Sequence, residues 1–341
     1  MIAKVRRRAT SSRKSMTGPS SPRTARISAF VALTAASIFW GLNAVASKVL
    51  FRPDSAAFDA LGLVVARSAW SLPVFLALAF FNRPRGGVER ADWRLFALLG
   101  VCIGPGTIGI FAFGAHETSA AHVVLLFALI PPVTAVLSAL ILRERLAALR
   151  LIALGLGIAG TVLLTTTRSA HGSSLRGDAC ILVMVVCFAI ISVVLRVLGR
   201  ARSYRPLFVT GLYCSLGMGL LLTIGLALGR AGAIVQPLVA NAAVLTWFFG
   251  IMIGGLTLFA QAAQTFALRT LGATIASIVA SYGSLLFGLI GAYVVLGESL
   301  NPAGIAAAII LALALLLGIV PIPERAALEP PAETEAPLAI S

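Results

Sequence analysis

Long apolar blocks that carry no charge constrain this chain more than any other feature of its sequence. Three of them are 151–164, 179–195 and 303–320, and their neighbours extend each toward about 20 residues, which as a helix cross about 30 Å of hydrocarbon. Lipid offers the backbone no hydrogen-bond partners, so a spanning segment must satisfy its own polar groups, as a helix does. The blocks do not alternate as the strands of a membrane barrel do. The sequence therefore predicts an all-α membrane protein.

The charged residues are too few to cover a water-facing surface. They make up 11% of the chain, whereas an average soluble domain has about 25%. The net charge of +15 would suit a nucleic-acid-binding protein, but the basic residues lie between the apolar blocks and in the N-terminal tail, as in membrane proteins. We therefore expect the lipid bilayer as a partner and no nucleic acid. The four cysteines lie inside apolar blocks without metal-ligand spacing and are expected to be small core residues.

The apolar blocks divide into about ten transmembrane helices joined by short polar connectors. The predicted spans are 27–49, 58–81, 93–114, 119–142, 147–166, 178–198, 206–228, 244–267, 271–296 and 302–320. Residues 1–26, which carry eight basic and no acidic residues, are predicted to be a disordered tail, with a targeting segment as the alternative. Residues 167–177 are predicted to be a linker, and residues 321–341 a second disordered tail.

The distribution of basic residues predicts the orientation of these spans. With the N-terminal tail inside the cell, the inner side carries 20 arginines and lysines and the outer side 5. Without the tail the counts are 12 and 5, so the bias does not depend on it. Cytoplasmic connectors carry such an excess, and we expect both termini in the cytoplasm.

An internal similarity predicts two repeats. Trp93 and Trp247, like Glu144 and Glu298, are 154 residues apart. The repeats, 27–166 and 178–320, would hold five helices each, and an odd number inverts the second relative to the first. Glu144 would then lie on the cytoplasmic side and Glu298 on the opposite one. Inverted repeats are common in secondary transporters, whose substrate binds between them near the middle of the membrane.

Several short motifs, in this order along the chain, resemble the drug/metabolite transporter superfamily, EamA type. They are Phe39-Trp40-Gly41-Leu42-Asn43, Arg67, Ala120-Ala121, Pro131, Ala135, Leu142-Arg143-Glu144-Arg145-Leu146, Gly155 and Gly160, and then Ala273 through Glu298 and Gly304. The resemblance covers roughly residues 30–320. It implies a ten-helix transporter of metabolites with both termini cytoplasmic and a central cavity between the repeats.

Polar and aromatic residues within the spans are the candidates for a substrate site. They are Trp40, Asn43, Arg67, Phe111, His122, Gln261, Gln264, Thr265 and Tyr282. The two glutamines and Thr265 share a helix face, where they can hold a polar solute or bond a neighbouring helix. Arg67 can bind a substrate carboxylate, or pair with a carbonyl or with Asp59. His122 can couple transport to protons, or bond another helix.

Prolines and glycines interrupt two of the predicted spans. Gly104-Pro105-Gly106 falls within the third span and Pro131-Pro132 within the fourth. Each proline removes a backbone hydrogen bond, which leaves a carbonyl to line a cavity or marks a packing kink. Gly155, Gly157 and Gly160 permit close helix approach, within a repeat or between the subunits of an oligomer.

Taken together, these features predict a transporter and no enzyme. We expect a secondary transporter of small polar or amphipathic metabolites, amino-acid-like or drug-like, that works by alternating access in the cell membrane, with export as the direction. His116-Glu117 begins a string like HExxH, but residue 120 is alanine, so no zinc pair forms. We expect no cofactor and no metal. The alternatives are a channel or a membrane scaffold.

Overall fold

Helices make up all of the regular secondary structure that the computed structural model describes, which covers residues 22–50, 58–117, 126–142, 148–166, 174–296 and 302–319. In the first half of the chain these are α2 (Pro22–Leu50), α3 (Ala60–Phe81), α4 (Trp93–Ile103), the π-helix η1 (Gly104–Gly109), α5 (Ile110–Glu117), α7 (Ile130–Leu142) and α8 (Ala148–Thr166). In the second half they are α9 (Leu175–Ala201), α10 (Pro206–Ala227), the 3₁₀ turns η2 (Ala231–Ile234) and η3 (Gln236–Val239), α11 (Ala242–Leu245), the π-helix η4 (Thr246–Phe259), α12 (Ala260–Thr270), α13 (Ala273–Leu296) and α14 (Pro302–Ile319).

Seven helical stretches in these ranges are long and apolar enough to cross a membrane. Three shorter apolar helices, Ile130–Leu142, Ala148–Leu163 and Pro302–Leu317, fall within three of the remaining predicted spans. The prediction of an all-α, multi-pass membrane protein is confirmed by this architecture together with the length and composition of the helices. The number of ten spans and the inverted repeat stay predictions.

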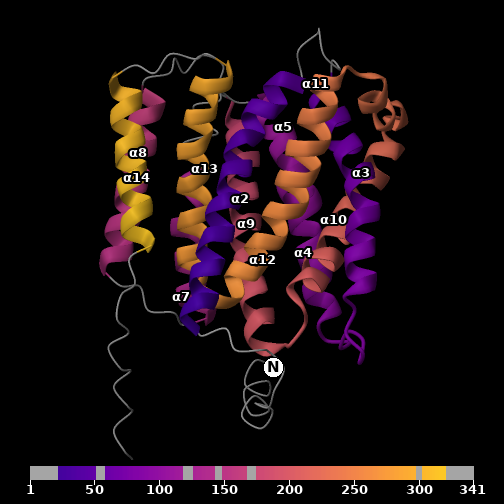
Figure 1. Ribbon diagram of the computed structural model, residues 1–341, viewed down its shortest axis with the longest axis horizontal. Helices are drawn as coiled ribbons and strands as arrows, with labels where there is room; N and C mark the ends of the chain where they lie inside the picture. The colour runs from indigo at the N-terminus through magenta and orange to yellow at the C-terminus, as the bar shows by residue number, and fades with distance from the viewer. Residues whose placement is uncertain are drawn as a thin grey trace, which may run out of the picture.

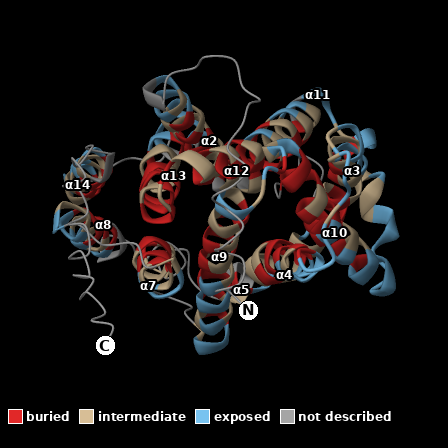
Figure 2. Ribbon diagram, turned by 90° about the horizontal axis from the view of Figure 1, so that it is seen from below, coloured by how far each residue is buried: buried red, intermediate tan, exposed pale blue. Residues whose placement is uncertain are grey.

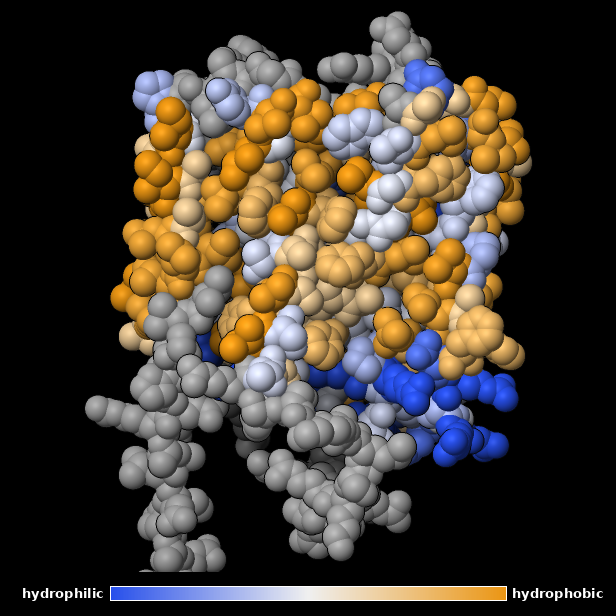
Figure 3. Space-filling model, in the orientation of Figure 1, coloured by the Kyte–Doolittle hydropathy of each residue, from blue (hydrophilic) through white to orange (hydrophobic). Residues whose placement is uncertain are grey.

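The helices stand side by side in an upright bundle, and their exposed surface is largely apolar (Figures 1 and 3). α10 packs along α3, α13 along α2, and α14 along α8. Seen from below, the α8–α14 pair lies at one edge of the bundle and the buried residues face its interior (Figure 2). Apolar side chains at the lipid-facing surface are expected where hydrocarbon replaces water as solvent.

Two glycines show how closely the helix backbones approach each other. A Cβ added to Gly211 of α10 would lie 2.5 Å from the backbone nitrogen of Ala79 in α3. One added to Gly41 of α2 would lie 2.5 Å from that of Gly288 in α13. Any larger side chain at either position would force the helices apart, so glycine is required for this packing. Of the glycines expected to permit close approach, Gly160 packs against α14, whereas a Cβ at Gly155 would meet nothing within 4 Å.

The predicted interruptions appear as changes in helical geometry. Pro105 lies in the first π-helix, where the Thr107 hydroxyl donates to the Cys102 carbonyl at 2.7 Å. The second π-helix contains Thr257, whose hydroxyl donates to the Met252 carbonyl, also at 2.7 Å. Both hydroxyls thus bond the carbonyl five residues back, and π turns of this kind are frequent at functional sites. The chain also leaves helical geometry at residues 128–129, directly before Pro131.

Candidate functional site

Arg67 is a cation in the interior of the bundle with one described side-chain hydrogen bond. It lies on α3, and its Nε donates to the Thr257 hydroxyl of η4 at 2.7 Å. Because the Thr257 proton is already donated to Met252, its oxygen is free to accept. The two terminal nitrogens of the guanidinium have no hydrogen-bond partner among the residues that the structure describes. Arg67 therefore brings the first half of the chain against the second and keeps donors for a further group.

Asp59, the acid that the sequence offered as one possible partner of Arg67, is engaged elsewhere. Its carboxylate accepts from the Gly62 amide at 3.0 Å and so caps the first turn of α3. It also pairs with Arg230 at 3.0 Å, at the end of the bundle. A carboxylate at a helix N-terminus stabilises the helix dipole, which explains its position. The described ion pairs leave Arg67 without a carboxylate.

Two further hydrogen bonds join α10 to α12 and extend the polar contacts below Arg67. The Tyr213 hydroxyl donates to Gln261 Oε1 at 3.1 Å, and the Thr210 hydroxyl donates to Thr265 Oγ1 at 2.9 Å. Gln261 and Thr265 thus make the helix–helix bonds that the sequence left open as the alternative to a substrate contact. Sequence reasoning missed Thr210, Tyr213 and Thr257. The regular spacing of 257, 261 and 265 along one helix face was the signal that could have found Thr257.

Gln264 differs from its two neighbours. It is 2% exposed, and its Oε1 has no hydrogen-bond partner within the described ranges. A buried polar atom without a partner is rare and calls for an unseen water or ligand. Gln264 is therefore the glutamine whose surroundings best suit contact with a solute.

The aromatic candidates Trp40 and Phe111 lie around a shared partner. The Trp40 ring of α2 meets Phe188 of α9 edge to face, with 6.4 Å between centroids. Phe188 packs against the same core cluster as Phe111 of α5, and the Phe111 ring lies 5.6 Å from that of Phe127. The structure thus links these aromatic residues of α2, α5 and α9, although their ranges are far apart in the chain.

Tyr282 does not join this group. Its side chain is fully buried between α13 and α8, where its hydroxyl donates to the Leu154 carbonyl at 3.1 Å. Gly157 leaves the room for its ring, since a Cβ there would overlap the phenol. The position of Tyr282 is accounted for by helix packing.

The remaining candidates are Asn43 and His122. Asn43 is half-buried on α2, and its carbonyl accepts from the Ser47 hydroxyl at 2.8 Å. His122 lies outside the described residues, as do Glu144 and Glu298. The second cation within a predicted span, Arg196, donates to the carbonyls of Leu268 and Arg269 at 2.9 and 2.7 Å. It thereby caps the C-terminal end of α12.

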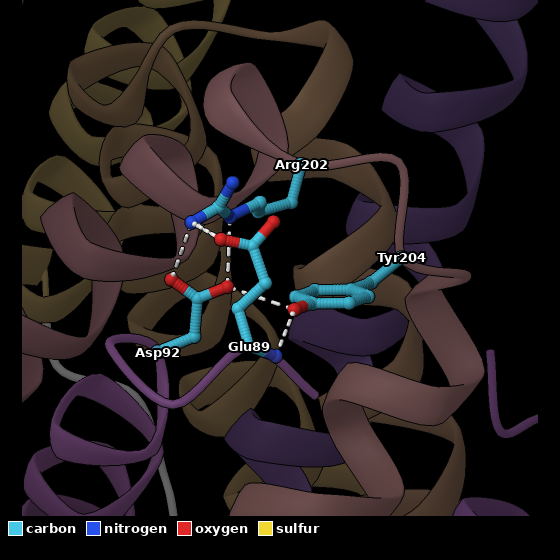
Figure 4. Close-up of polar contacts among 4 residues, drawn as sticks. All are labelled: Glu89, Asp92, Arg202 and Tyr204. Carbon is cyan, nitrogen blue, oxygen red and sulfur yellow. Dashed lines mark hydrogen bonds and ion pairs between the residues drawn. The ribbon is translucent and has the colours of Figure 1, made fainter. Parts of the chain in front are cut away.

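A polar cluster joins the two halves at one end of the bundle (Figure 4). We call this the arginine-rich end, because it carries the exposed residues Arg83, Arg85, Arg90, Arg94 and Arg200. Arg202, which follows α9, reaches Asp92, which precedes α4, through two hydrogen bonds, and its Nη2 also pairs with Glu89 at 2.7 Å. The Tyr204 hydroxyl donates to Asp92 at 2.8 Å and accepts from the Glu89 amide at 3.2 Å. The hydrogen bond to Asp92 raises the pKa of Arg202, and burial raises the pKa of Tyr204. The described polar contacts of this cluster are thus made among its own four residues.

Comparison with known proteins agrees with this arrangement. Residues 27–166 match the model of the EamA-like transporter family. A solved structure described as "Crystal structure of protein" superposes with a TM-score of 0.62 at 18% identity, covering 86% of this chain and 96% of that one, which shows a shared fold. A comparison with curated proteins finds no match.

The expected resemblance is therefore confirmed for the first half of the chain. The family match and the apolar helices indicate a multi-pass membrane protein of the transporter class. Over residues 27–166 this chain is similar to the EamA-like transporter family, and this similarity is consistent with membership of the drug/metabolite transporter superfamily.

Proposed function

We propose that this protein is a secondary transporter that moves small polar or amphipathic metabolites, amino-acid-like or drug-like, across the cell membrane. It works by alternating access between two inverted five-helix repeats with both termini cytoplasmic, and it exports its substrate. The family match supports the transporter class. The contact between Arg67, from the first half, and Thr257, from the second, supports a site between the halves.

The terminal nitrogens of Arg67, which have no described partner, are the observation that supports a carboxylated substrate. An arginine at this depth costs about 2.5–3.5 kcal/mol on insertion scales unless something answers its charge. Thr257 satisfies only Nε, and the acid nearest in sequence, Asp59, caps α3 and pairs with Arg230. The two terminal nitrogens form one edge of the guanidinium fork, which matches the two oxygens of a carboxylate. A carboxylated solute that binds there completes the charge balance.

Gln264 supports a second contact with the same solute, through its Oε1 acceptor. A buried oxygen without a partner suits a donor such as an ammonium or amide group of the solute. Together, Arg67 and Gln264 offer complementary contacts for a zwitterion. The amino-acid-like class is therefore the first to test.

Transport in proteoliposomes tests the proposal. We expect saturable uptake of a carboxylated solute and acceleration by the same solute on the opposite side, which a channel does not show. Arg67→Lys keeps the charge but loses the planar fork. It should weaken transport of acids by about tenfold and change transport of their esters or amides little.

Arg196→Lys provides the matched control. This arginine also lies within a predicted span, but its described contacts are backbone carbonyls. We expect the ratio of acid to ester transport to stay at the wild-type value. An equal loss for acids and esters in Arg67→Lys, with folded protein maintained, would assign Arg67 to structure and contradict the proposal.

A further inference from the structure

A pair of grooves lies on the outer surface of the bundle, away from the polar contacts of the interior. One, of about 390 Å³, runs between α2 and α10 over the surface of α12, where Ala262, Ala263 and Phe266 line it. The other, of about 440 Å³, follows α2 from Thr24 to Ala35. The two share Ala32 and Phe259, so they form one continuous depression.

The depression runs along α12 and α2. Between Phe259 and Phe266, the first and last residues of this stretch that line it, a helix rises about 10 Å, a third of the about 30 Å hydrocarbon thickness. Its lining along this length is mostly apolar, and the part that follows α2 also includes Thr24 and Ser28. The space thus has the polarity that an acyl chain requires.

The end of the first groove is polar and positively charged. Arg205 and Asn82 line it, beside Pro206. Arg205 is exposed and has no polar partner in the described part of the chain. It is the N-cap of α10, with Pro206 as the first helical residue and no side-chain cap. The first amides of a helix have no acceptor within the helix and favour an anion. The Arg205 guanidinium and the N-terminal amides of α10 therefore both favour an anion at the same position.

The surroundings reinforce the preference for negative charge. Exposed arginines gather at this end of the bundle, below the apolar band, as the hydrophilic patch in Figure 3 shows. They are Arg83, Arg85, Arg90, Arg94 and Arg200. Arg202, in contrast, is already neutralised by Asp92. A zwitterionic headgroup gains less than an anionic one from such a field.

We propose that this depression is a binding site for an anionic phospholipid. The headgroup phosphate binds Arg205 and the N-terminus of α10, and an acyl chain lies over Ala262 and Phe266 toward Phe259. The same two turns of α12 carry Gln261 and Gln264 on their buried side. The lipid therefore stabilises the helix that bears these glutamines. The site requires that α2, α10 and α12 cross a bilayer, and it is independent of the transported solute.

Binding to the purified, delipidated full-length protein tests the site. The probes are phosphatidylglycerol, phosphatidylcholine with the same acyl chains, and inorganic phosphate, with the melting temperature and the bound mass as readouts. We expect phosphatidylglycerol alone to raise the melting temperature. Arg205→Gln should weaken its binding about tenfold, the effect of losing a hydrogen bond to a charged group.

Two further variants separate this site from a diffuse charge effect. Ala262→Phe fills the groove without touching the cation, and it should also weaken phosphatidylglycerol binding. It decides the test if Arg205→Gln does not fold. Arg85→Gln removes an exposed arginine outside the groove and should leave binding within about twofold of wild type.

Three results would overturn the proposal. Equal losses in Arg85→Gln and Arg205→Gln would show unspecific attraction to the arginine-rich end. Equal binding of phosphatidylcholine would show that the headgroup is not recognised. Inorganic phosphate that binds as tightly as phosphatidylglycerol, unaffected by Ala262→Phe, would assign a site for a free anion.

Discussion

Arg202 and Asp92, which lie 110 residues apart, form an ion pair of two hydrogen bonds, with Nε–Oδ2 at 2.7 Å and Nη2–Oδ1 at 3.1 Å. Asp92 is 5% exposed, and the Arg202 side chain 22%. The pair ties the connection between α3 and α4 to the connection between α9 and α10. It therefore holds together the two halves of the chain at the arginine-rich end.

Asp92→Asn should destabilise the fold by on the order of 2 kcal/mol, because it leaves Arg202 without its buried counter-charge. The free energy of unfolding, measured by titration with a denaturing detergent, gives this value. A double-mutant cycle with Arg202→Gln should return a coupling energy of similar size. Glu89→Gln is the control. The Glu89 side chain is 61% exposed, so the Arg202–Glu89 ion pair should contribute less than about 1 kcal/mol. Additive effects of Asp92→Asn and Arg202→Gln would refute the coupling.

Stability should fall in alkaline solution through Tyr204. Burial raises the pKa of its phenol, so the folded state retains the proton at a pH where the unfolded chain has lost it. The stabilisation is fully present below the unfolded pKa of about 10 and is lost as pH rises through the folded pKa. Melting temperatures measured between pH 9 and 11 should decline more steeply in wild type than in Tyr204→Phe. Parallel curves would show that Tyr204 does not contribute.

Substitutions of the two glutamines of α12 should affect different properties, transport in one case and stability in the other. Gln264→Leu should lower transport several-fold with little change in the melting temperature, because its acceptor has no described partner. Gln261→Leu should lower the melting temperature, as should Tyr213→Phe, since each breaks the 3.1 Å bond between α10 and α12, a contribution of about 1 kcal/mol. Transport assays on equal amounts of folded protein, with thermal unfolding beside them, make the comparison. Wild-type transport in Gln264→Leu would remove it from the site.

The inverted repeat predicts labelling from opposite sides of the membrane. Cysteines placed at Glu144 and at Glu298 should react with a membrane-impermeant maleimide from the inside and the outside, respectively. The background replaces the four native cysteines by serine. Labelling of both from one side would contradict the repeat and the span count together.

Much of the architecture could be predicted from local pattern. The predicted spans 58–81 and 206–228 differ from α3 and α10 by two residues or fewer at either end. α9 begins at Leu175, ahead of the predicted 178, because the Ser174 hydroxyl accepts the Gly177 amide at 3.3 Å and caps the helix there. Helix length and charge distribution follow from each segment's own contact with lipid, and need no knowledge of its neighbours.

The candidate site was predicted less completely. The residue types were informative, since Arg67, Gln261 and Thr265 are polar groups in apolar helices and each has a polar partner within the bundle. The sequence did not indicate their partners, because nothing in it distinguishes Thr257 and Tyr213 from other residues of a membrane helix. Gln261 and Gln264 were indistinguishable in sequence.

By itself, then, the sequence determined that this protein is helical, spans a membrane and gathers its arginines at one end. The tertiary structure alone decided that Arg67 meets Thr257, 190 residues away, that Gln261 is paired while Gln264 is not, and that Tyr282 packs against α8. The physical reason is the range of the forces. Burial in lipid acts on each helix separately, whereas a hydrogen bond requires two side chains within about 3 Å, and only the packing of distant helices sets that distance.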